Sequence, residues 1–430
     1  MPGPLFPLSV QLADLPADFR ARALSWAAGF EHCAYFEPND LPYPHGPFER
    51  LLAVAEADAA ASHSLDGLPA GGQSAASAPQ VGFVTYDVKN DIEALTSQNH
   101  DGFNWPKLHF FTPQTWLRWR EGTVEIHGLV EGVLGQILAQ AVPLVPAPQV
   151  PIMRPRMAKA DYLRAVAAIR EDILNGEVYE LNLCQEFYAE NVDLAPEDVF
   201  WRLMQASPTP FAGFIRWRAH YLLCASPERY LSRRQEQIIS QPIKGTVRRG
   251  RTPAADEHQR HTLLHDEKER AENLMIVDLV RNDLARVAQT GSIRVPELFG
   301  LYPFRHVWQM ISTVTAALRS DVDLVDVLKA TFPMGSMTGA PKIRAMQLIE
   351  HYENSRRGLY SGSIGYRWPG GDFEFNVVIR SLQYRRDTGY LSFQVGSAIT
   401  YDSDPEREYD ECLLKAKALL EVLNARINEQ

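Results

Sequence analysis

Two pairs of glutamates with helical spacing are the residues that most suggest chemistry. Glu269 and Glu272 lie three residues apart in EKERAENLMIV, and Glu408 and Glu411 repeat this spacing in PEREYDECLLK, with Lys415 one turn further on. Residues three or four apart share one face of a helix. If the two pairs faced each other, their carboxylates would suit Mg²⁺, which takes hard oxygen ligands. The spacing is also typical of solvated helix surface, and by itself it gives no reason for two helices to meet.

The helices that carry these glutamates can be placed from the same stretches. Residues from about 265 to 287 predict one long helix, on which Ile276 and Val280 continue the glutamate face. Asp404 and Pro405 fit the N-cap and the first position of a last helix. The glutamates then lie at the edge of a core, where a carboxylate is costly unless it is paired or bound to a metal.

The rest of the chain predicts an α+β fold with large antiparallel sheets packed with helices. Hairpin-like strands are interspersed with helices, without the regular alternation that a parallel sheet requires. Residues 56–80 are small and polar and predict a mobile loop, whereas the proline-rich residues 143–156 predict an extended connector. We therefore expect a strand-rich N-terminal domain over residues 1–150 and a second domain over residues 157–425.

Composition disfavours several classes of function. The chain has 430 residues and a formal net charge of −10, and its 43 basic residues are spread thinly, which disfavours nucleic acid as a partner. Its start lacks the pattern of a secretory signal, and no apolar run reaches the roughly 18 residues of a membrane span. The four cysteines are scattered without metal spacing, so we expect reduced thiols in a cytoplasmic protein.

Several stretches occur in an order that is similar to one enzyme family. They fall within residues 157–425 and are NGEVYELNL, SPTPFAGF, ASPERY, QPIKGT, AENLMIVDLVRNDLARV, GSMTGAPKIRAMQLIE, YSGSIGY, VVIRS and DSDPEREYDECLLKAKA. Together they resemble the chorismate-binding domain of aminodeoxychorismate synthase component I, anthranilate synthase component I and the isochorismate and salicylate synthases. The N-terminal part resembles the family less, chiefly through VGFVTYDVKNDIE.

The resemblance implies where a metal and the substrate bind. The two glutamate helices would meet at one Mg²⁺ bound to the ring carboxylate of chorismate, and this metal would give an acidic protein the positive charge that its anionic substrate needs. Glu272 and Glu411 match the closest ligands, with Glu269 and Glu408 as their companions. The other implied contacts to chorismate are Arg380 and Tyr360 at the enolpyruvyl carboxylate, the backbone of a glycine-rich turn at Gly396, Ser397 and Ala398, Lys415 on the last helix, and Ser336 and Thr338 in the pocket wall.

Lys244 in QPIKGT separates the members of this family. It follows a strand-like stretch and precedes a Gly-Thr turn, and it matches a lysine of aminodeoxychorismate synthases that is alanine in anthranilate synthases. The resemblance implies that this lysine attacks C2 of chorismate as a neutral amine and expels the C4 hydroxyl, before ammonia adds at C4. We therefore expect a partly desolvated site that lowers the pKa of Lys244. Glu228 matches the general acid/base for the leaving hydroxyl, and His306 matches a histidine near the ring carboxylate.

Glu180 in VYELNL departs from the family pattern. Members that add ammonia usually have glutamine at this position, and members that add water have lysine. Glu180 therefore counts against the water-using enzymes, and it would either place negative charge beside the substrate or form an ion pair with Lys244. In the first domain, Ala53 and Val54 stand where tryptophan-sensing anthranilate synthases have Glu-Ser, which argues against feedback by tryptophan.

The resemblance thus implies a magnesium-dependent synthase subunit that converts chorismate and ammonia to 4-amino-4-deoxychorismate, on the route to p-aminobenzoate. The sequence contains no glutaminase domain, so we expect ammonia to come from a separate glutamine amidotransferase or from free ammonium. Two alternatives remain open. One is anthranilate synthase component I, which Lys244 disfavours, and the other is an inactive homologue that serves only as a partner subunit, which the intact site residues disfavour.

Overall fold

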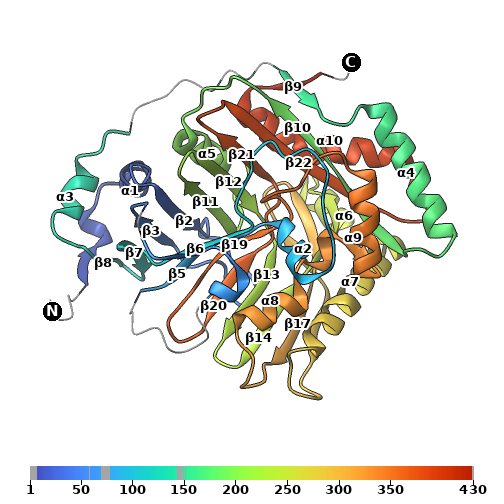
Figure 1. Ribbon diagram of the computed structural model, residues 1–430, viewed down its shortest axis with the longest axis horizontal. Coiled ribbons are helices and arrows are strands. Elements are labelled where there is room, and N and C mark those ends of the chain that lie inside the picture. Colours follow the sequence, from blue (N-terminus) through green and yellow to red (C-terminus); the bar gives the residue numbers. More distant parts are fainter. Residues whose placement is uncertain are drawn as a thin grey trace.

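Two large sheets, which pack face to face, form the centre of the molecule (Figure 1). The computed structural model describes residues 7–57, 59–68, 78–142, 148, 150 and 152–428. Within these residues every strand pair but β9–β23 is antiparallel, so the predicted α+β fold with antiparallel sheets is confirmed.

The first sheet runs, in spatial order, through β1 (Leu8–Gln11), β8 (Thr123–Gly128), β7 (Thr115–Arg120), β3 (Leu51–Ala55), β2 (His32–Glu37), β11 (Phe211–Trp217), β12 (His220–Ser226), β21 (Ser381–Arg385), β22 (Tyr390–Ile399), β10 (Glu180–Ala189), β9 (Ile152–Pro155) and β23 (Arg426–Ile427), with β18 (Gly339–Ala340) also paired to β10. The second sheet runs through β15 (Ile243–Arg248), β17 (Val307–Ala317), β14 (Gln237–Gln241), β13 (Arg229–Arg234), β20 (Phe373–Asn376), β19 (Ser363–Arg367), β5 (Gln80–Val84), β6 (Leu108–Phe111) and β4 (Ala61–Ser62), with β16 (Arg294–Pro303) also paired to β17.

Helices cover the outer face of each sheet. Figure 1 shows α4 (Lys159–Leu174) and α10 (Pro405–Leu423) beside β10 and β22, and α7 (Glu267–Ala285) and α8 (Leu324–Thr331) beside β14 and β17. The other helices are α1 (Phe19–Ala27), α2 (Lys89–Ile92), α3 (Val133–Leu138), α5 (Pro196–Ala206), α6 (Pro253–His265) and α9 (Lys342–Tyr352), and short 3₁₀ turns include η2 (Leu65–Gly67) and η4 (Gly335–Met337).

The alternation of side chains along the strands builds separate cores on the two faces of a sheet. In β2, Cys33 and Tyr35 pack in the cluster under α1, α4, α5 and α10, whereas Ala34 and Phe36 pack in the cluster between the two sheets. Successive strand residues point to opposite faces, so a strand with both faces covered is apolar throughout. A third cluster lies between the second sheet and α7 and α8.

Local sequence signals place the ends of the helices that carry the candidate site. The Asp266 side chain accepts a hydrogen bond from the Glu269 amide at 3.0 Å and caps α7. Asp404 does the same for the Arg407 amide at 3.0 Å, and Pro405 is the first residue of α10, as the sequence predicted. Side-chain caps of this kind satisfy amides that have no partner inside the helix.

Both sheets run across the predicted domain boundary. Strands from residues 1–150 pair directly with strands that follow the connector, as in β2 with β11 and β5 with β19. The division near residue 150 remains a prediction about folding units, since hydrogen-bonded sheets join the two parts. Of the predicted loop 56–80, residues 58 and 69–77 lie outside the described residues, and part of the remainder forms β4 and η2. Among the described helices, none has the length and apolar character needed to span a membrane.

Candidate active site

Lys244 lies on a β-bulge and not before a turn, so this detail of the sequence prediction is wrong. Between two ladder pairs with β17, strand β15 carries one extra residue. Gly245 accommodates it with a positive φ of 99°, and a bulge of this kind changes the direction of the neighbouring side chain. A Cβ added at Gly245 would lie 3.3 Å from Glu269 Oε2, so the bulge brings Lys244 close to the first glutamate helix.

The Lys244 side chain is nearly buried and is paired with Glu180. Its Nζ donates to Glu180 Oε1 at 2.7 Å, and the two side chains are 11% and 2% exposed. Burial opposes charge on the amine, but the carboxylates of Glu180, Glu272 and Glu411 outweigh burial and raise the pKa of Lys244. The expected lowering of this pKa is therefore wrong, because nearby negative charge exceeds the effect of desolvation. Of the two roles left open for Glu180, the ion pair is the one observed.

Helix α7 is joined to the lysine strand by a residue that sequence reasoning missed. The buried Asn273 donates from Nδ2 to the Lys244 carbonyl at 3.1 Å, and its Oδ1 accepts from Ser312 Oγ at 2.5 Å. The available signal was an amide side chain among the apolar residues of this helix. Next to it, burial raises the pKa of Glu272 to about 7, with repulsion from Glu180 adding to the effect and Lys244 opposing it.

Helix α10 carries the second glutamate pair and Lys415, and Glu411 is more exposed there than Glu272 is on α7. The Glu408 residue is 5% exposed, whereas the Glu411 side chain is 48% exposed. Lys415 Nζ donates to Glu411 Oε1 at 2.6 Å and to the Gly396 carbonyl at 2.8 Å. Burial acts to raise the pKa of Glu411, but nearby ammonium groups, that of Lys415 foremost, lower it. Lys415 thus neutralises Glu411 and ties α10 to β22.

The glutamates fit a magnesium ion by their chemistry. Within the described ranges, no three His, Cys, Asp or Glu side chains lie close enough to share a metal, and Lys268 and Lys415 stand beside Glu272 and Glu411 at 3.8 and 2.6 Å. The carboxylate oxygens are nevertheless the hard donors that Mg²⁺ prefers. Burial raises the pKa of Glu269, and repulsion from Glu411 contributes. A cation between the helices would relieve this excess of negative charge.

Glu228 is a buried carboxyl group that can hold a proton near neutral pH. It is 4% exposed and stands just before β13. Burial raises its pKa to about 7, although hydrogen bonds from Ser336 and from the Ile243 amide, and the charge of Lys244, oppose this rise. A carboxyl group whose pKa lies near the working pH can both give and take a proton.

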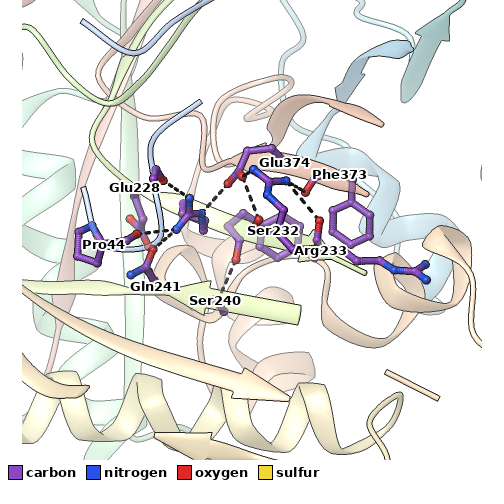
Figure 2. Close-up of polar contacts among 12 residues, drawn as sticks. Pro44, Glu228, Ser232, Arg233, Ser240, Gln241, Phe373 and Glu374 are labelled. Carbon is purple, nitrogen blue, oxygen red and sulfur yellow. Dashed lines mark hydrogen bonds and ion pairs between the residues drawn. The ribbon is translucent and has the colours of Figure 1, made fainter. Parts of the chain in front are cut away.

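A buried ion network holds the backbone behind Glu228 (Figure 2). The next residue, Arg229, is fully buried and bonds Glu374 Oε1 at 2.5 Å, and Glu374 also accepts from Ser232 Oγ at 2.9 Å. The other partners of the Arg229 guanidinium are the Gln241 side chain and the carbonyls of Pro44 and Gly46. Strands β13, β14 and β20 and the loop after β2 are thereby fixed around the start of β13.

Arg380 and Tyr360 offer a place for a substrate carboxylate. Arg380 follows β20 with a positive φ of 53°, and in the described part of the chain its guanidinium makes no hydrogen bond or ion pair. Burial lowers its pKa, with the Tyr360 phenol and Glu411 acting in the other direction. A partly buried arginine without an anion is costly, and a carboxylate can satisfy it with two parallel hydrogen bonds.

Arg357 ties together segments that carry candidate site residues, and sequence reasoning missed it. It forms a buried pair with Glu353 at 2.7 Å and donates to the carbonyls of Met337 at 2.6 Å and Asn182 at 3.0 Å. Glu353 in turn accepts from the Cys184 amide at 2.8 Å. These contacts join β10, η4 and the segment that leads to β19. The sequence signal was weak, because a charged residue such as Arg357 is usually expected at the protein surface.

Ser336 and Thr338 lie at η4 but make different contacts. The Ser336 hydroxyl bonds the Glu228 carboxyl group, which brings it into the site. Thr338 is 1% exposed and donates from Oγ1 to the Met334 carbonyl at 3.2 Å, within its own loop. The structure therefore brings Ser336 to the predicted acid, whereas the Thr338 hydroxyl is used locally.

Gly396, Ser397 and Ala398 lie inside β22, so the predicted glycine-rich turn is wrong. They pair with residues 182–184 of β10 in an unbroken antiparallel ladder. A Cβ at Gly396 would lie 2.6 Å from a carbonyl oxygen of β10, which explains the glycine by close approach of two strands. The Ser397 hydroxyl contacts the Tyr162 hydroxyl at 3.1 Å. The pairing joins residues far apart in sequence, and local sequence cannot reveal it.

His306 makes no contact with the other candidate site residues in the described chain. It is exposed between β16 and β17, and its Nε2 contacts the Ala206 carbonyl at 3.2 Å. Gln309, three residues later, is 5% exposed and pairs with Thr246 next to the bulge. Its Oε1 has no partner among the described residues. A buried amide oxygen that lacks a partner among the described residues is a further candidate for a substrate contact, and the role expected of His306 stays a prediction.

The fold and the site together define a class of protein. Residues 23–421 match the family model of the chorismate binding enzymes. The chain therefore belongs to the chorismate-binding enzyme family, as its motifs predicted.

Three similar proteins narrow the comparison. The aminodeoxychorismate synthase component 1 of Bacillus subtilis is 32% identical over 364 residues, which cover 80% of this chain and 76% of that protein. A probable chloroplastic aminodeoxychorismate synthase of Oryza sativa is 42% identical over 269 residues, 62% of this chain, but the match spans only 30% of that longer protein. The crystal structure of anthranilate synthase component I from Streptococcus pneumoniae superposes with a TM-score of 0.75 at 26% identity, covering 96% of this chain and 92% of the other.

Proposed function

We propose that this chain is an aminodeoxychorismate synthase subunit that converts chorismate and ammonia to 4-amino-4-deoxychorismate. The observation that carries the proposal is the position of Lys244, whose amine is held on a bulge beside Glu180 and within reach of the charges of Glu272 and Glu411. The resemblance assigns alanine to this position in anthranilate synthases. The names of the relatives in B. subtilis and O. sativa support the same activity.

The remaining groups are suited to this reaction. Glu228, with its pKa raised to about 7 by burial, would protonate the C4 hydroxyl as it leaves. The guanidinium of Arg380, which has no partner in the described part of the chain, would hold the enolpyruvyl carboxylate with Tyr360 beside it. Gln309, whose side-chain oxygen lacks a partner within the described ranges, would accept a hydrogen bond from the substrate. These groups bind and orient chorismate, while Lys244 supplies the lone pair.

Glu272 and Glu411 would hold a Mg²⁺ ion, with Glu269 and Glu408 as companions. The support is the excess of carboxylate charge between α7 and α10. Burial and repulsion between these carboxylates raise the pKa values of Glu269 and Glu272. When bound, the ion would neutralise the ring carboxylate of chorismate. The lysines beside Glu272 and Glu411 would then be free to turn toward the substrate.

Ammonia would come from a separate glutamine amidotransferase. The designation component 1 in the B. subtilis relative supports a partner subunit of this kind. We expect the purified chain to use ammonium at alkaline pH, where free ammonia is abundant, and to use glutamine only after an amidotransferase is added. Turnover of glutamine by the pure chain would contradict this part of the proposal.

Product identification tests the activity itself. The chain would be incubated with chorismate, Mg²⁺ and ammonium, and the products identified by mass and by NMR. We expect 4-amino-4-deoxychorismate, which retains the enolpyruvyl group. Formation of anthranilate with release of pyruvate would assign the chain to the anthranilate branch, and absence of any chorismate consumption would favour an inactive partner subunit.

A further inference from the structure

The ion pair between Glu180 and Lys244 raises a chemical problem that its surroundings define. An amine can attack carbon only through a free lone pair, so Lys244 must first lose a proton. Its surroundings favour the charged form, because the carboxylates near it raise its pKa against the effect of burial. Release of the proton to bulk water is hindered, since the side chain is only 11% exposed. A local acceptor is therefore required.

The charged and titratable groups around the amine come from four elements. Glu180 opens β10, Glu228 precedes β13, Glu269 and Glu272 lie on α7, and Glu411 lies on α10. Of these, only the Glu180 carboxylate is hydrogen-bonded to Nζ in the described structure, at 2.7 Å. This distance lies within the range over which a general base takes a proton directly.

The second oxygen of Glu180 is also informative. The residue is 1% exposed, and Oε2 is buried without a hydrogen-bond partner among the described residues. Among the described residues the carboxylate therefore has no donor other than Lys244, and it can take a proton without breaking another hydrogen bond. Burial of an ion pair desolvates both charges, whereas the neutral acid and the neutral amine avoid this cost. Proton transfer within the pair therefore costs less free energy than loss of the proton to solvent, which would leave the carboxylate charge buried alone.

We propose that Glu180 is the proton acceptor that converts Lys244 into a nucleophile, an inference that rests on the proposed function. One proton moves from Nζ to Glu180. The Nζ–C2 bond then forms, two ring π pairs shift, the C4–O bond breaks, and a proton from Glu228 lets the hydroxyl leave as water.

The second half of the cycle restores Glu180 to a carboxylate and Glu228 to an acid. Ammonia forms the C4–N bond, the π pairs shift back and the Nζ–C2 bond breaks. Glu180 returns its proton to the released Lys244 amine, and the Glu228 carboxylate takes a proton from the new C4 ammonium group. The net change is chorismate plus ammonia to aminodeoxychorismate plus water. At this position the chain thus has a carboxylate that can take a proton, where ammonia-using relatives usually have glutamine.

The test measures the first half of the cycle alone. The wild-type chain and the Glu180→Gln variant would be mixed with chorismate and Mg²⁺ without ammonia, quenched at intervals, and assayed by mass spectrometry for the adduct on the Lys244 peptide. Glu177→Gln is the matched control, because Glu177 is exposed and pairs only with Arg344 in the described chain. Chorismate affinity and the thermal transition of each variant would verify that the pocket is intact.

We expect the Glu180→Gln variant to form the adduct about 100-fold more slowly than the wild type near neutral pH. The ratio of variant to wild-type rate should then rise about tenfold per pH unit, because the variant depends on proton loss to solvent. Taking the ratio removes the effect of Glu228, which both proteins share.

Three results would contradict parts of this account, and they can be told apart. Equal adduct rates in the variant and wild type, with the same pH dependence, would overturn the role of Glu180 and leave the proposed function standing. A variant that stays slow at every pH would also overturn it, since Glu180 would then position Lys244 and not deprotonate it. Absence of the adduct in the wild type would instead overturn the proposed function.

Discussion

Two lysine–glutamate pairs of nearly equal length occupy the same site in different surroundings. Lys244 and Glu180 are 2.7 Å apart with side chains 11% and 2% exposed, whereas Lys415 and Glu411 are 2.6 Å apart with side chains 29% and 48% exposed. The first pair connects two strands far apart in sequence, and the second joins adjacent turns of α10. Exposed pairs contribute little and rearrange readily, while a buried pair fixes both groups. We infer that the buried pair performs chemistry and the exposed pair holds ligands.

The largest effect should come from removing the buried amine. Lys244→Ala should lower kcat by about 10³-fold while changing the KM for chorismate little, because the lost interaction belongs to the reaction path. Lys244→Arg should not restore activity, since a guanidinium stays protonated. Lys415→Ala is the matched change in the exposed pair and should mainly raise the KM. Steady-state kinetics with ammonium would check this, and similar kcat losses for both alanine variants would erase the distinction.

Glu228 should show the next largest effect and a defined pH dependence. Glu228→Gln should lower kcat by about 10²-fold, because the amide cannot protonate the leaving hydroxyl. In the wild type the proton is present below the pKa of about 7 and is lost above it, so adduct formation without ammonia should slow as the pH rises past this value. The rate of adduct formation against pH is the measurement. A profile unchanged by Glu228→Gln would exclude this residue as the acid.

The two glutamate helices should respond with opposite signs in stability. The pKa of Glu272 is raised from 4.5 to about 7, so its contribution is present at acidic pH and is lost as the pH rises through 7. Without metal at pH 8, Glu272→Gln should therefore raise stability by about 1–3 kcal/mol. The pKa of Glu411 is lowered, so its contribution is present above its ordinary pKa, and Glu411→Gln should lower stability slightly.

Added Mg²⁺ should stabilise the wild type more than the Glu272→Gln and Glu411→Gln variants. If the ion binds between α7 and α10, it should raise the melting temperature of the wild type and much less that of either variant. Both variants should also lose about 10-fold or more in activity at limiting Mg²⁺. Thermal unfolding at several pH values and metal concentrations would check both expectations. A metal response that survives in both variants would contradict the assigned ligands.

The smallest effect on turnover should come from Asn273, which links α7 to the lysine strand. Asn273→Ala removes its bonds to the Lys244 carbonyl and Ser312 and should cost about 1–3 kcal/mol of unfolding free energy. The kcat should fall several-fold, with the adduct still on Lys244. Denaturant unfolding and kinetics would measure both. An unchanged kcat would show that the position of the bulge does not depend on this helix.

The sequence predicted features that depend on neighbouring residues. The N-cap at Asp404 and the helix start at Pro405 were predicted correctly because capping depends on neighbouring residues. The motifs also identified the fold. They predicted that Glu180, Lys244 and Glu272 belong to one site, and the structure places these residues near each other. The sequence did not predict the raised pKa of Lys244, since it arises from carboxylates on three distant elements.

The wrong prediction of a turn at Gly396 has a similar origin. The segment at Gly396 was predicted as a turn because its pairing partner in β10 lies about two hundred residues earlier in the chain, and no local signal reveals this pairing. His306 was chosen by residue type and family resemblance, and its expected role stays a prediction, whereas burial adds Gln309 as a candidate that the sequence did not reveal. Burial and long-range strand register are properties of the folded chain, and a motif match reports neither.

The mass of the Lys244 peptide tests the central claim most directly. The chain would be incubated with chorismate and Mg²⁺ in the absence of ammonia, quenched, digested and compared with the same digest of Lys244→Ala. We predict that the wild-type peptide gains the mass of chorismate less one water at Lys244, and that this gain disappears when ammonium is added and turnover resumes. An unmodified peptide under conditions where ammonium supports full turnover would contradict covalent catalysis by Lys244 and remove the main distinction from an anthranilate synthase.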